Sequence, residues 1–255
     1  VIIGTASIVV MISLGLGLQK SMYDEIEKSG GLTEIEVMSK NMWGMDQGSS
    51  EEQILLTDEI VKDLAGLEHV EYASPVLNIS AIALKGNYEG WIDINGLSHE
   101  ALEAMDIPLK EGGRLPAQNS GTLEFIYGNT VIQNFHNKSG GGGYWDTGEL
   151  PDIDLENDSL FVILDQDAYY QSGSNVPGGE GDNAAPRVAK KFVVKASGVV
   201  EGTIDDWNQF SYATYCDLDT LKNVLTKEFK GRAIPGQPTQ KNGKPYKYFV
   251  YNSAK

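Results

Sequence analysis

The sequence VIIGTASIVVMISLGLGLQ, Val1–Gln19, contains no charged residue and is followed by KSMYDEIEKSGG, which ends at Gly30 and Gly31. A run of about 18 or more uncharged, mostly apolar residues is long enough to cross a hydrocarbon core of about 30 Å. The next residues keep a helical pattern, and glycine commonly ends a helix. We therefore predict a transmembrane helix that continues as a charged stalk, the two together spanning residues 1–30.

A secretory signal peptide is the main alternative for this stretch. It would begin with Met and a basic segment, and it would end in small residues at a cleavage site followed by irregular chain. The sequence instead begins with Val1 and continues helically, which favours a membrane helix. The absence of an initiating Met also leads us to expect that the sequence is a fragment of a longer protein.

The composition restricts the partners of the remaining chain. About 235 residues follow the apolar stretch, which is enough for one large domain or two small ones with a core. The formal net charge of −16 argues against nucleic acid, because phosphate binding requires clustered Lys and Arg. The same charge disfavours binding to anionic lipid surfaces.

Charge is distributed unevenly along the chain. Residues 139–186 contain no Lys or Arg and ten Asp or Glu, whereas residues 220–255 contain eight Lys or Arg and a single Glu. Glycine-rich segments, GGGG at Gly140–Gly143 and PGGEGDNAAP at Pro177–Pro186, flank the acidic stretch. Such a compositional island between loop-forming segments predicts an inserted subdomain or an elaborated loop.

Hydrophobic periodicity and turn residues predict short strands and helices after the apolar stretch. Strands are predicted at 33–40, 70–84, 90–96, 191–200, 212–217 and 246–252. Gly86-Asn87 is expected to join the second and third of these strands in a hairpin. Helices are predicted to begin at the caps Thr57, Ser98 and Asp219 and to end near residues 67, 105 and 229. This mixture predicts an α+β fold.

Several of these segments, taken in order, resemble a known family. They are the apolar stretch itself, LTEIEV at 32–37, TDEIVKDLAGLEHVEYASPVL at 57–77, WIDINGLSHEAL at 91–102, EGGRLP at 111–116, IYGNTVIQNF at 126–135 and FVVKASGVVEG at 192–202. Together they resemble the extracytoplasmic core domain of MacB-like ABC transporter permeases. The acidic stretch departs from the family's usual inserted segment in its glycine runs and its acidity.

The resemblance implies a division of the chain. In that family a membrane helix extends outward as a stalk, and the outer domain consists of two α/β halves, called the porter, with a second subdomain inserted between them. Carried onto this sequence, residues 31–116 are the first porter-like half, 117–190 an inserted acidic, β-rich subdomain, and 191–255 the return segment and second porter-like half. The family pattern continues beyond the last predicted strand, so we expect the second half to be truncated.

The resemblance also implies a function in transport. The chain would be the extracytoplasmic domain of a permease in the cell membrane, non-catalytic and without a cofactor, that couples cytoplasmic ATP hydrolysis to export or extraction of a substrate by mechanical transmission. The sequence contains no G-x-x-x-x-G-K-[ST] phosphate-binding loop, so ATP would bind to a separate ATP-binding subunit or domain. A second permease copy and a membrane-fusion or adaptor protein are the other implied partners. Peptide, lipopeptide, lipoprotein and drug substrates remain open alternatives.

Other chemistry finds little support in the sequence. The single cysteine, Cys216, is expected to be a small buried residue, and His69, His99 and His136 follow no metal-binding spacing. The run of acids at 152–158 alternates like a calcium loop but lacks its glycine and its final glutamate. We therefore expect a solvated acidic segment there and predict neither a metal site nor catalytic residues.

Aromatic residues in or beside loops are the remaining candidates for a binding surface. They are Trp43, Trp91, Tyr144, Trp145, Tyr169, Tyr170 and Trp207. For Trp91 and Trp207, filling of the core is an equal alternative. The pair Tyr144 and Trp145, between glycines and acids, is the favoured contact for a cationic peptide or an accessory protein.

A membrane sensor is the alternative from another class. A single membrane helix followed by an acidic α/β ectodomain also fits the ligand-binding domain of a receptor kinase or chemoreceptor. A secreted enzyme or an adhesin is a third possibility, for which the sequence offers no supporting group of residues.

Overall fold

A computed structural model describes residues 2–28, 35–38, 55–173, 188–240 and 244–255 of the chain. The structure divides into two units, residues 1–36 and residues 37–255. The second unit is called the domain below. Each unit is described by itself.

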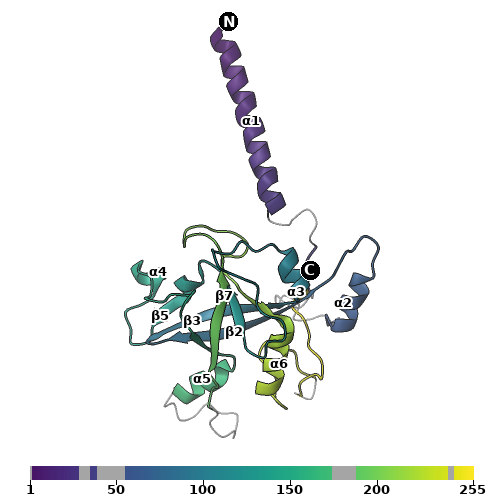
Figure 1. The fold of residues 1–255 in the computed structure, drawn as a ribbon, viewed down its shortest axis with the longest axis vertical. Coiled ribbons are helices and arrows are strands. Elements are labelled where there is room, and N and C mark those ends of the chain that lie inside the picture. The colour runs from purple at the N-terminus through teal and green to yellow at the C-terminus, as the bar shows by residue number, and fades with distance from the viewer. Residues whose placement is uncertain (1, 29–34, 39–54, 174–187, 241–243) are drawn as a thin grey trace, which may run out of the picture. The chain divides into compact units, whose positions relative to one another are not determined.

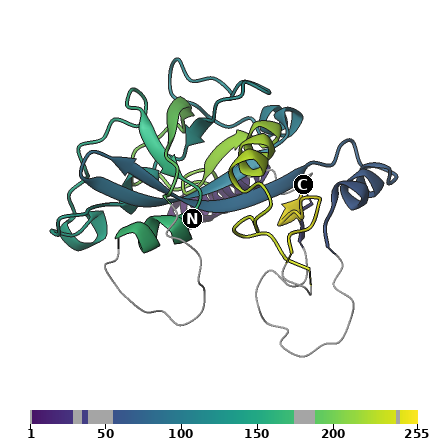
Figure 2. The same cartoon turned by 90° about the horizontal axis from the view of Figure 1, so that it is seen from below.

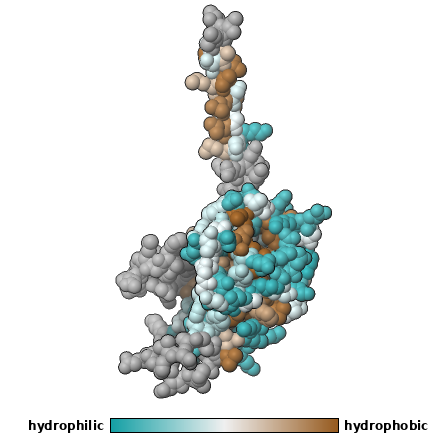
Figure 3. Space-filling model, turned by 90° about the vertical axis from the view of Figure 1, so that its left-hand side faces the viewer, coloured by the Kyte–Doolittle hydropathy of each residue, from teal (hydrophilic) through white to brown (hydrophobic). Residues whose placement is uncertain are grey.

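The first unit contains one long helix among its described residues. Helix α1 spans Ile2–Lys28, and its segment Gly4–Tyr23, with a mean hydropathy of 1.3, is long and apolar enough to cross a membrane. Side chains of this segment are exposed along its whole length, and Figure 3 shows them as a largely hydrophobic band. The predicted apolar helix, continuing into the charged residues after Gln19, is confirmed.

The domain combines strands with short helices (Figure 1). In chain order they are β1 (Val37–Met38), α2 (Asp58–Ala65), β2 (Pro75–Lys85), β3 (Tyr88–Leu97), α3 (His99–Ala104), β4 (Glu124–Tyr127), the 3-10 turn η1 (Val131–Asn134), β5 (Phe135–Asn137), α4 (Tyr144–Thr147), β6 (Leu160–Ile163), α5 (Gln166–Gly173), β7 (Phe192–Val199), β8 (Thr214–Asp217), α6 (Leu218–Glu228) and β9 (Ser253–Ala254). The α+β class predicted from the sequence is confirmed.

The strands form one sheet that closes on itself. The hydrogen-bonded order is β1-β9-β2-β6-β7-β4-β8-β3-β5, and β2 also pairs with β3. Six strands, β2, β6, β7, β4, β8 and β3, therefore complete a ring. Two contacts within it, β3 with β8 and β4 with β7, are parallel, and the others are antiparallel.

The largest hydrophobic core lies on one face of these strands, because side chains alternate along a strand. Leu77, Ile79, Ala81 and Ala83 of β2 all belong to it, together with residues of β3, β4, β6 and α6. The opposite face of the sheet carries two smaller clusters, one under α3 and one beside α5. Helices α3 and α5 thus cover different parts of the outer surface.

The predicted hairpin and the second predicted helix are confirmed. Strands β2 and β3 pair from Leu77 with Gly96 to Lys85 with Tyr88, which leaves Gly86 and Asn87 as the two-residue turn. Helix α3 begins after Ser98, whose side-chain oxygen accepts a hydrogen bond from the backbone N–H of Ala101. Helix α2 also begins after the predicted Thr57, but the Thr57 side chain forms no capping hydrogen bond.

Two predicted boundaries were wrong. Helix α6 is capped by Asp217 rather than Asp219, because the Asp217 carboxylate accepts hydrogen bonds from the backbone N–H and the hydroxyl of Thr220. Residues 246–252 do not form the predicted strand. The backbone of Val250 pairs instead with the side-chain amide of Gln237, and the strand β9 begins only at Ser253.

The predicted division at residues 30, 116 and 190 remains a prediction. The ring contains strands from each predicted part of the domain: β2 and β3, then β4 and β6, then β7 and β8. The predicted strand at 33–40 lies partly outside the described residues, and β1 covers its Val37 and Met38.

Candidate functional site

Three aromatic pairs on the described surface of the domain each contain an exposed tryptophan. Their ring centroids lie 5.4 Å apart for Tyr144 and Trp145, 5.9 Å for Trp91 and Tyr170, and 4.9 Å for Trp207 and Tyr212. Aromatic pairs at such distances attract each other beyond the area that they bury. Trp43 lies outside the described residues.

The pair favoured by the sequence, Tyr144 and Trp145, occupies a single helical turn. Helix α4 follows three glycines with positive φ, Gly140–Gly142, a backbone conformation that only glycine adopts readily. The Asp146 carboxylate accepts a hydrogen bond from the Gly143 N–H at 3.1 Å and so caps the turn. Trp145 is exposed over 66% of its surface.

The second pair lies where α5 meets the outer face of β3. Trp91 stacks on Tyr170 with an angle of 22° between the ring planes. The neighbouring Tyr169 donates a hydrogen bond to Glu89 at 2.7 Å, and His136 of β5 approaches the same carboxylate at 3.3 Å. Burial and this carboxylate raise the pKa of Tyr169 to about 12.

The third pair stands on the connection between β7 and β8, residues 201–212, which we call the aromatic loop. Trp207 is exposed over 60% of its surface and Tyr212 over 48%, and their rings meet edge to face. Phe210, between them in sequence, is buried and packs on Tyr215 in the cluster under α3. The loop is therefore anchored in the core at one residue and displays rings at two others. Filling of the core, the alternative for Trp91 and Trp207, is wrong for both.

Buried polar side chains from the segment after β4 hold the aromatic loop in place. The Asn129 amide donates hydrogen bonds to the carbonyls of Thr203 and Asp206, at 2.5 and 2.7 Å. Gln133 donates to the carbonyl of Ile204, and the Thr130 hydroxyl donates to that of Ser211. All three side chains are at least 94% buried.

Close backbone contact adds to this anchoring. A Cβ atom at Gly128 would lie 2.1 Å from the Ser211 carbonyl oxygen, so only glycine fits there. Within the loop, the Asp206 carboxylate accepts hydrogen bonds from the N–H and hydroxyl of Thr203, which lower the pKa of Asp206. The anchoring role of Gly128, Asn129 and Thr130 was not predicted from the sequence, although Gly and Asn directly after a strand are typical of a turn.

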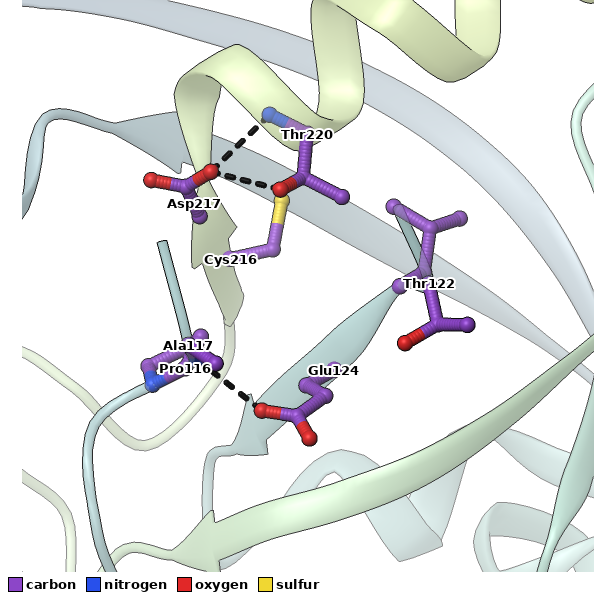
Figure 4. Close-up of a pocket in the computed structure, with 8 residues that line it drawn as sticks. Pro116, Ala117, Thr122, Glu124, Cys216, Asp217 and Thr220 are labelled. Atoms are coloured by element: carbon purple, nitrogen blue, oxygen red, sulfur yellow. Dashed lines mark hydrogen bonds between the residues drawn. The ribbon is translucent and has the colours of Figure 1, made fainter. Parts of the chain in front are cut away.

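A shallow crevice around Cys216 is occupied by structural contacts (Figure 4). It encloses about 140 Å³ including open solvent, less than the roughly 300–1,000 Å³ of most small-molecule sites. Cys216 is 1% exposed, and burial raises the pKa of its thiol. Asp217 caps α6, and Glu124 forms two hydrogen bonds with Arg114. A reactive thiolate is therefore disfavoured here.

The histidines and the acidic run have local partners. His99 lies 3.3 Å from Glu103, His136 pairs with Glu89, and His69 is exposed. Asp154 and Asp158 form turn hydrogen bonds, and Lys85 pairs with Asp158. Among the residues that the structure describes, three or more His, Cys, Asp or Glu side chains nowhere gather as metal ligands.

An apolar helix of membrane length precedes the α+β domain, and together with the match to a family of periplasmic domains this makes the chain a membrane protein with an extracytoplasmic domain. The chain belongs to the family of MacB-like periplasmic core domains, whose model matches residues 1–149. The resemblance noted in the sequence is thus confirmed.

Individual relatives are more distant. The probable export ATP-binding/permease protein MacB of Pseudomonas entomophila (strain L48) is 28% identical over 112 residues, which are 44% of this chain and 16% of that protein. The chain thus spans about a sixth of that relative's length. The periplasmic region of MacB from Actinobacillus actinomycetemcomitans is similar in structure with a TM-score of 0.46 and 13% identity, covering 90% of this chain and 75% of that one. The extracellular domain of the noncanonic ABC-type transporter YknZ from Gram-positive bacteria is similar with a TM-score of 0.41 and 12% identity, covering 78% of this chain and 71% of that one.

Proposed function

We propose that this chain is the extracytoplasmic domain of an ABC transporter permease that transmits movement from a cytoplasmic ATPase to a substrate outside the membrane. The family match over residues 1–149, which includes both the apolar helix and the first part of the domain, carries this proposal. ATP is bound by a separate ATP-binding subunit or domain, and the working transporter contains two permease copies. The substrate is a peptide, lipopeptide, lipoprotein or drug, exported or extracted from the membrane, and an adaptor protein is a further possible partner. The domain itself catalyses no reaction.

The continuity of α1 supports mechanical transmission. The helix runs without a break from Ile2 to Lys28, through Gly15 and Gly17 and past the end of the apolar segment at Tyr23. At 1.5 Å per residue, the 20-residue apolar segment measures about 30 Å, the thickness of a hydrocarbon core. An unbroken helix transmits displacement along its axis, whereas a flexible break would absorb it.

Within the domain, the C-terminal segment connects elements that are far apart in sequence. Strand β9 pairs with β1 on one side and with β2 on the other; Figure 2 shows β9 as a short yellow arrow beside the C-terminus. Nearby, the Tyr251 hydroxyl donates a hydrogen bond to Asp58 of α2 and accepts one from Lys222 of α6 at 2.8 Å. A displacement that reaches β1 would therefore be passed to the ring through β9.

The test is an insertion in the full transporter. A flexible Gly-Ser segment placed after Gln19 should abolish transport while ATP binding remains intact. The matched control inserts seven helix-forming residues, about two turns, at the same position and should retain transport. Normal transport with the flexible insertion would contradict mechanical transmission.

We also propose that Tyr144 and Trp145 contact a cationic peptide substrate or an accessory protein. The exposure of Trp145 and the absence of Lys and Arg from residues 139–186 support this role. Replacing both residues with Ala should reduce transport or accessory-protein binding, with the domain still folded by circular dichroism. Unchanged transport and binding in the double variant would remove this role from the pair.

A further inference from the structure

The aromatic loop differs from the other aromatic pairs in how it is held. Asn129, Thr130 and Gln133 are buried side chains whose amides and hydroxyl are directed at loop carbonyls. Burying such groups is costly unless they are hydrogen-bonded. Together they tie the backbone of residues 203–211 to the segment after β4.

A fixed loop that exposes aromatic rings is suited to binding. Trp207 and Tyr212 are 60% and 48% exposed, while the adjacent Phe210 is 5% exposed. Trp and Tyr are the residues that most often dominate the energy of a protein interface. A loop that is ordered before binding loses little conformational entropy when a partner associates.

The charges around the rings indicate the chemistry of the partner. Glu201, Asp205 and Asp206 lie in the loop, and no Lys or Arg occurs from Ala196 to Leu221. In the described part of the chain, Asp206 is held by Thr203, whereas Glu201 and Asp205 are exposed and form no ion pair. In sequence, Asp205 and Asp206 lie within two residues of the exposed Trp207, and an acid near an indole favours a cation, which can lie over the ring face and pair with the carboxylate.

We propose that the aromatic loop, residues 201–212, is a preformed docking element for a basic protein segment that places an Arg or Lys side chain against Trp207 and Asp205. The inference concerns binding by the loop alone and does not depend on the transport role. Failure of the insertion test above would leave it intact.

The experiment uses the full chain in a non-ionic detergent and a fluorescein-labelled hexa-arginine amide as the probe, with binding measured by fluorescence anisotropy. Trp207→Ala should raise the Kd about five- to tenfold, and Asp205→Asn should raise it about two- to fivefold. Both residues are exposed, so neither change is expected to unfold the domain.

Two matched controls distinguish the loop from the general acidity of the chain. Trp91→Ala removes an exposed ring of another pair, and Asp167→Asn removes one exposed carboxylate from α5. Each should leave the Kd within about twofold. Equal effects of Trp207→Ala and Trp91→Ala, or no effect of Trp207→Ala, would overturn the proposal.

A third variant tests the role of the buried anchor. Asn129→Ala keeps both rings but removes the hydrogen bonds to the Thr203 and Asp206 carbonyls. It should weaken hexa-arginine binding and increase hydrogen exchange at residues 203–206 without increasing exchange in β2. Unchanged affinity with increased exchange in the loop would contradict the preformed state.

Two other binding partners of the loop, a membrane and a second copy of the chain, would give different results for the same variant. If Trp207→Ala instead removed the quenching of tryptophan fluorescence by brominated phosphatidylcholine in vesicles that hold the chain through α1, and left hexa-arginine binding unchanged, the loop would be a membrane contact and the proposal would fail. If the same variant changed only the sedimentation coefficient of the chain, the loop would be a contact between copies, and the proposal would fail as well.

Discussion

The aromatic loop and the turn around Tyr144 present the same kind of surface but are built differently. Each displays a Trp and a Tyr ring in edge-to-face contact. The loop is fixed by Asn129, Thr130 and Gln133, which are buried, whereas the turn depends on glycines and on exposed Asp146. The same rings can thus be presented by core anchoring or by local turn chemistry.

This difference determines how each region should respond to change. A hydrogen bond from a buried side chain cannot be replaced by water without opening the structure, whereas an exposed one can. Substitutions that disturb the loop, at Gly128 for example, should therefore lower the stability of the whole domain. Substitutions in the turn should change only the structure of the turn itself.

The largest effect is expected for Gly128→Ala. The new methyl group would lie 2.1 Å from the Ser211 oxygen and 2.5 Å from its carbonyl carbon, so the backbone of the loop must move. We expect the free energy of unfolding to fall by about 3 kcal/mol, measured by urea denaturation of the chain in detergent. The matched variant in the turn, Gly141→Ala, has a positive φ but open space around it, and should cost about 1–2 kcal/mol. Equal losses would show that the loop is not anchored more firmly than the turn.

An intermediate, local effect is expected when the pH is lowered. The pKa of Asp206 in the folded loop lies below its ordinary value because the N–H and hydroxyl of Thr203 donate hydrogen bonds to the carboxylate. The contribution of these bonds is therefore complete above the unfolded pKa of about 3.9 and is lost as the pH falls through the lower, folded value. The NMR signal of the Thr203 amide should shift with a midpoint below about 3.9. Asp206→Asn should remove this transition, and its persistence in that variant would refute the assignment.

The smallest effect is expected for Asp146→Ala in the turn. The Asp146 carboxylate is exposed and accepts one hydrogen bond from Gly143. Its loss should change the free energy of unfolding by about 0.5 kcal/mol or less, as measured by thermal unfolding. A loss above about 1.5 kcal/mol would mean that the turn, like the loop, is coupled to the core.

Local structure was predictable from the sequence where neighbouring residues decide it. The turn Gly86-Asn87 between apolar alternations and the cap Ser98 before a helical pattern both depend on short-range contacts, and both were confirmed. At α6, Asp217 and Asp219 are chemically equivalent candidates. The hydrogen bond to Thr220, three residues after Asp217, decides between them, and only the folded backbone shows it.

Long-range structure was not predictable in this way. The aromatic alternation of residues 246–252 is typical of a strand, but a strand requires a neighbour, and the Gln237 side chain takes the backbone groups of Val250. Closure of the ring depends on β2 pairing with β6 as well as with its hairpin partner β3, and no local pattern specifies the pairing of β2 with β6. The anchoring of the aromatic loop has the same character, because Asn129 binds carbonyls more than 70 residues away in sequence.

The position of β9 also sets an order in time. Among the described strands, β1 pairs only with β9, so Val37 and Met38 join the sheet through Ser253 and Ala254, more than 200 residues later. At the usual 5–20 residues per second, the ribosome needs roughly 10 to 40 s to make the intervening chain. During that interval β1 leaves the ribosome without its partner strand, and among the described strands its pairing is the last that synthesis allows.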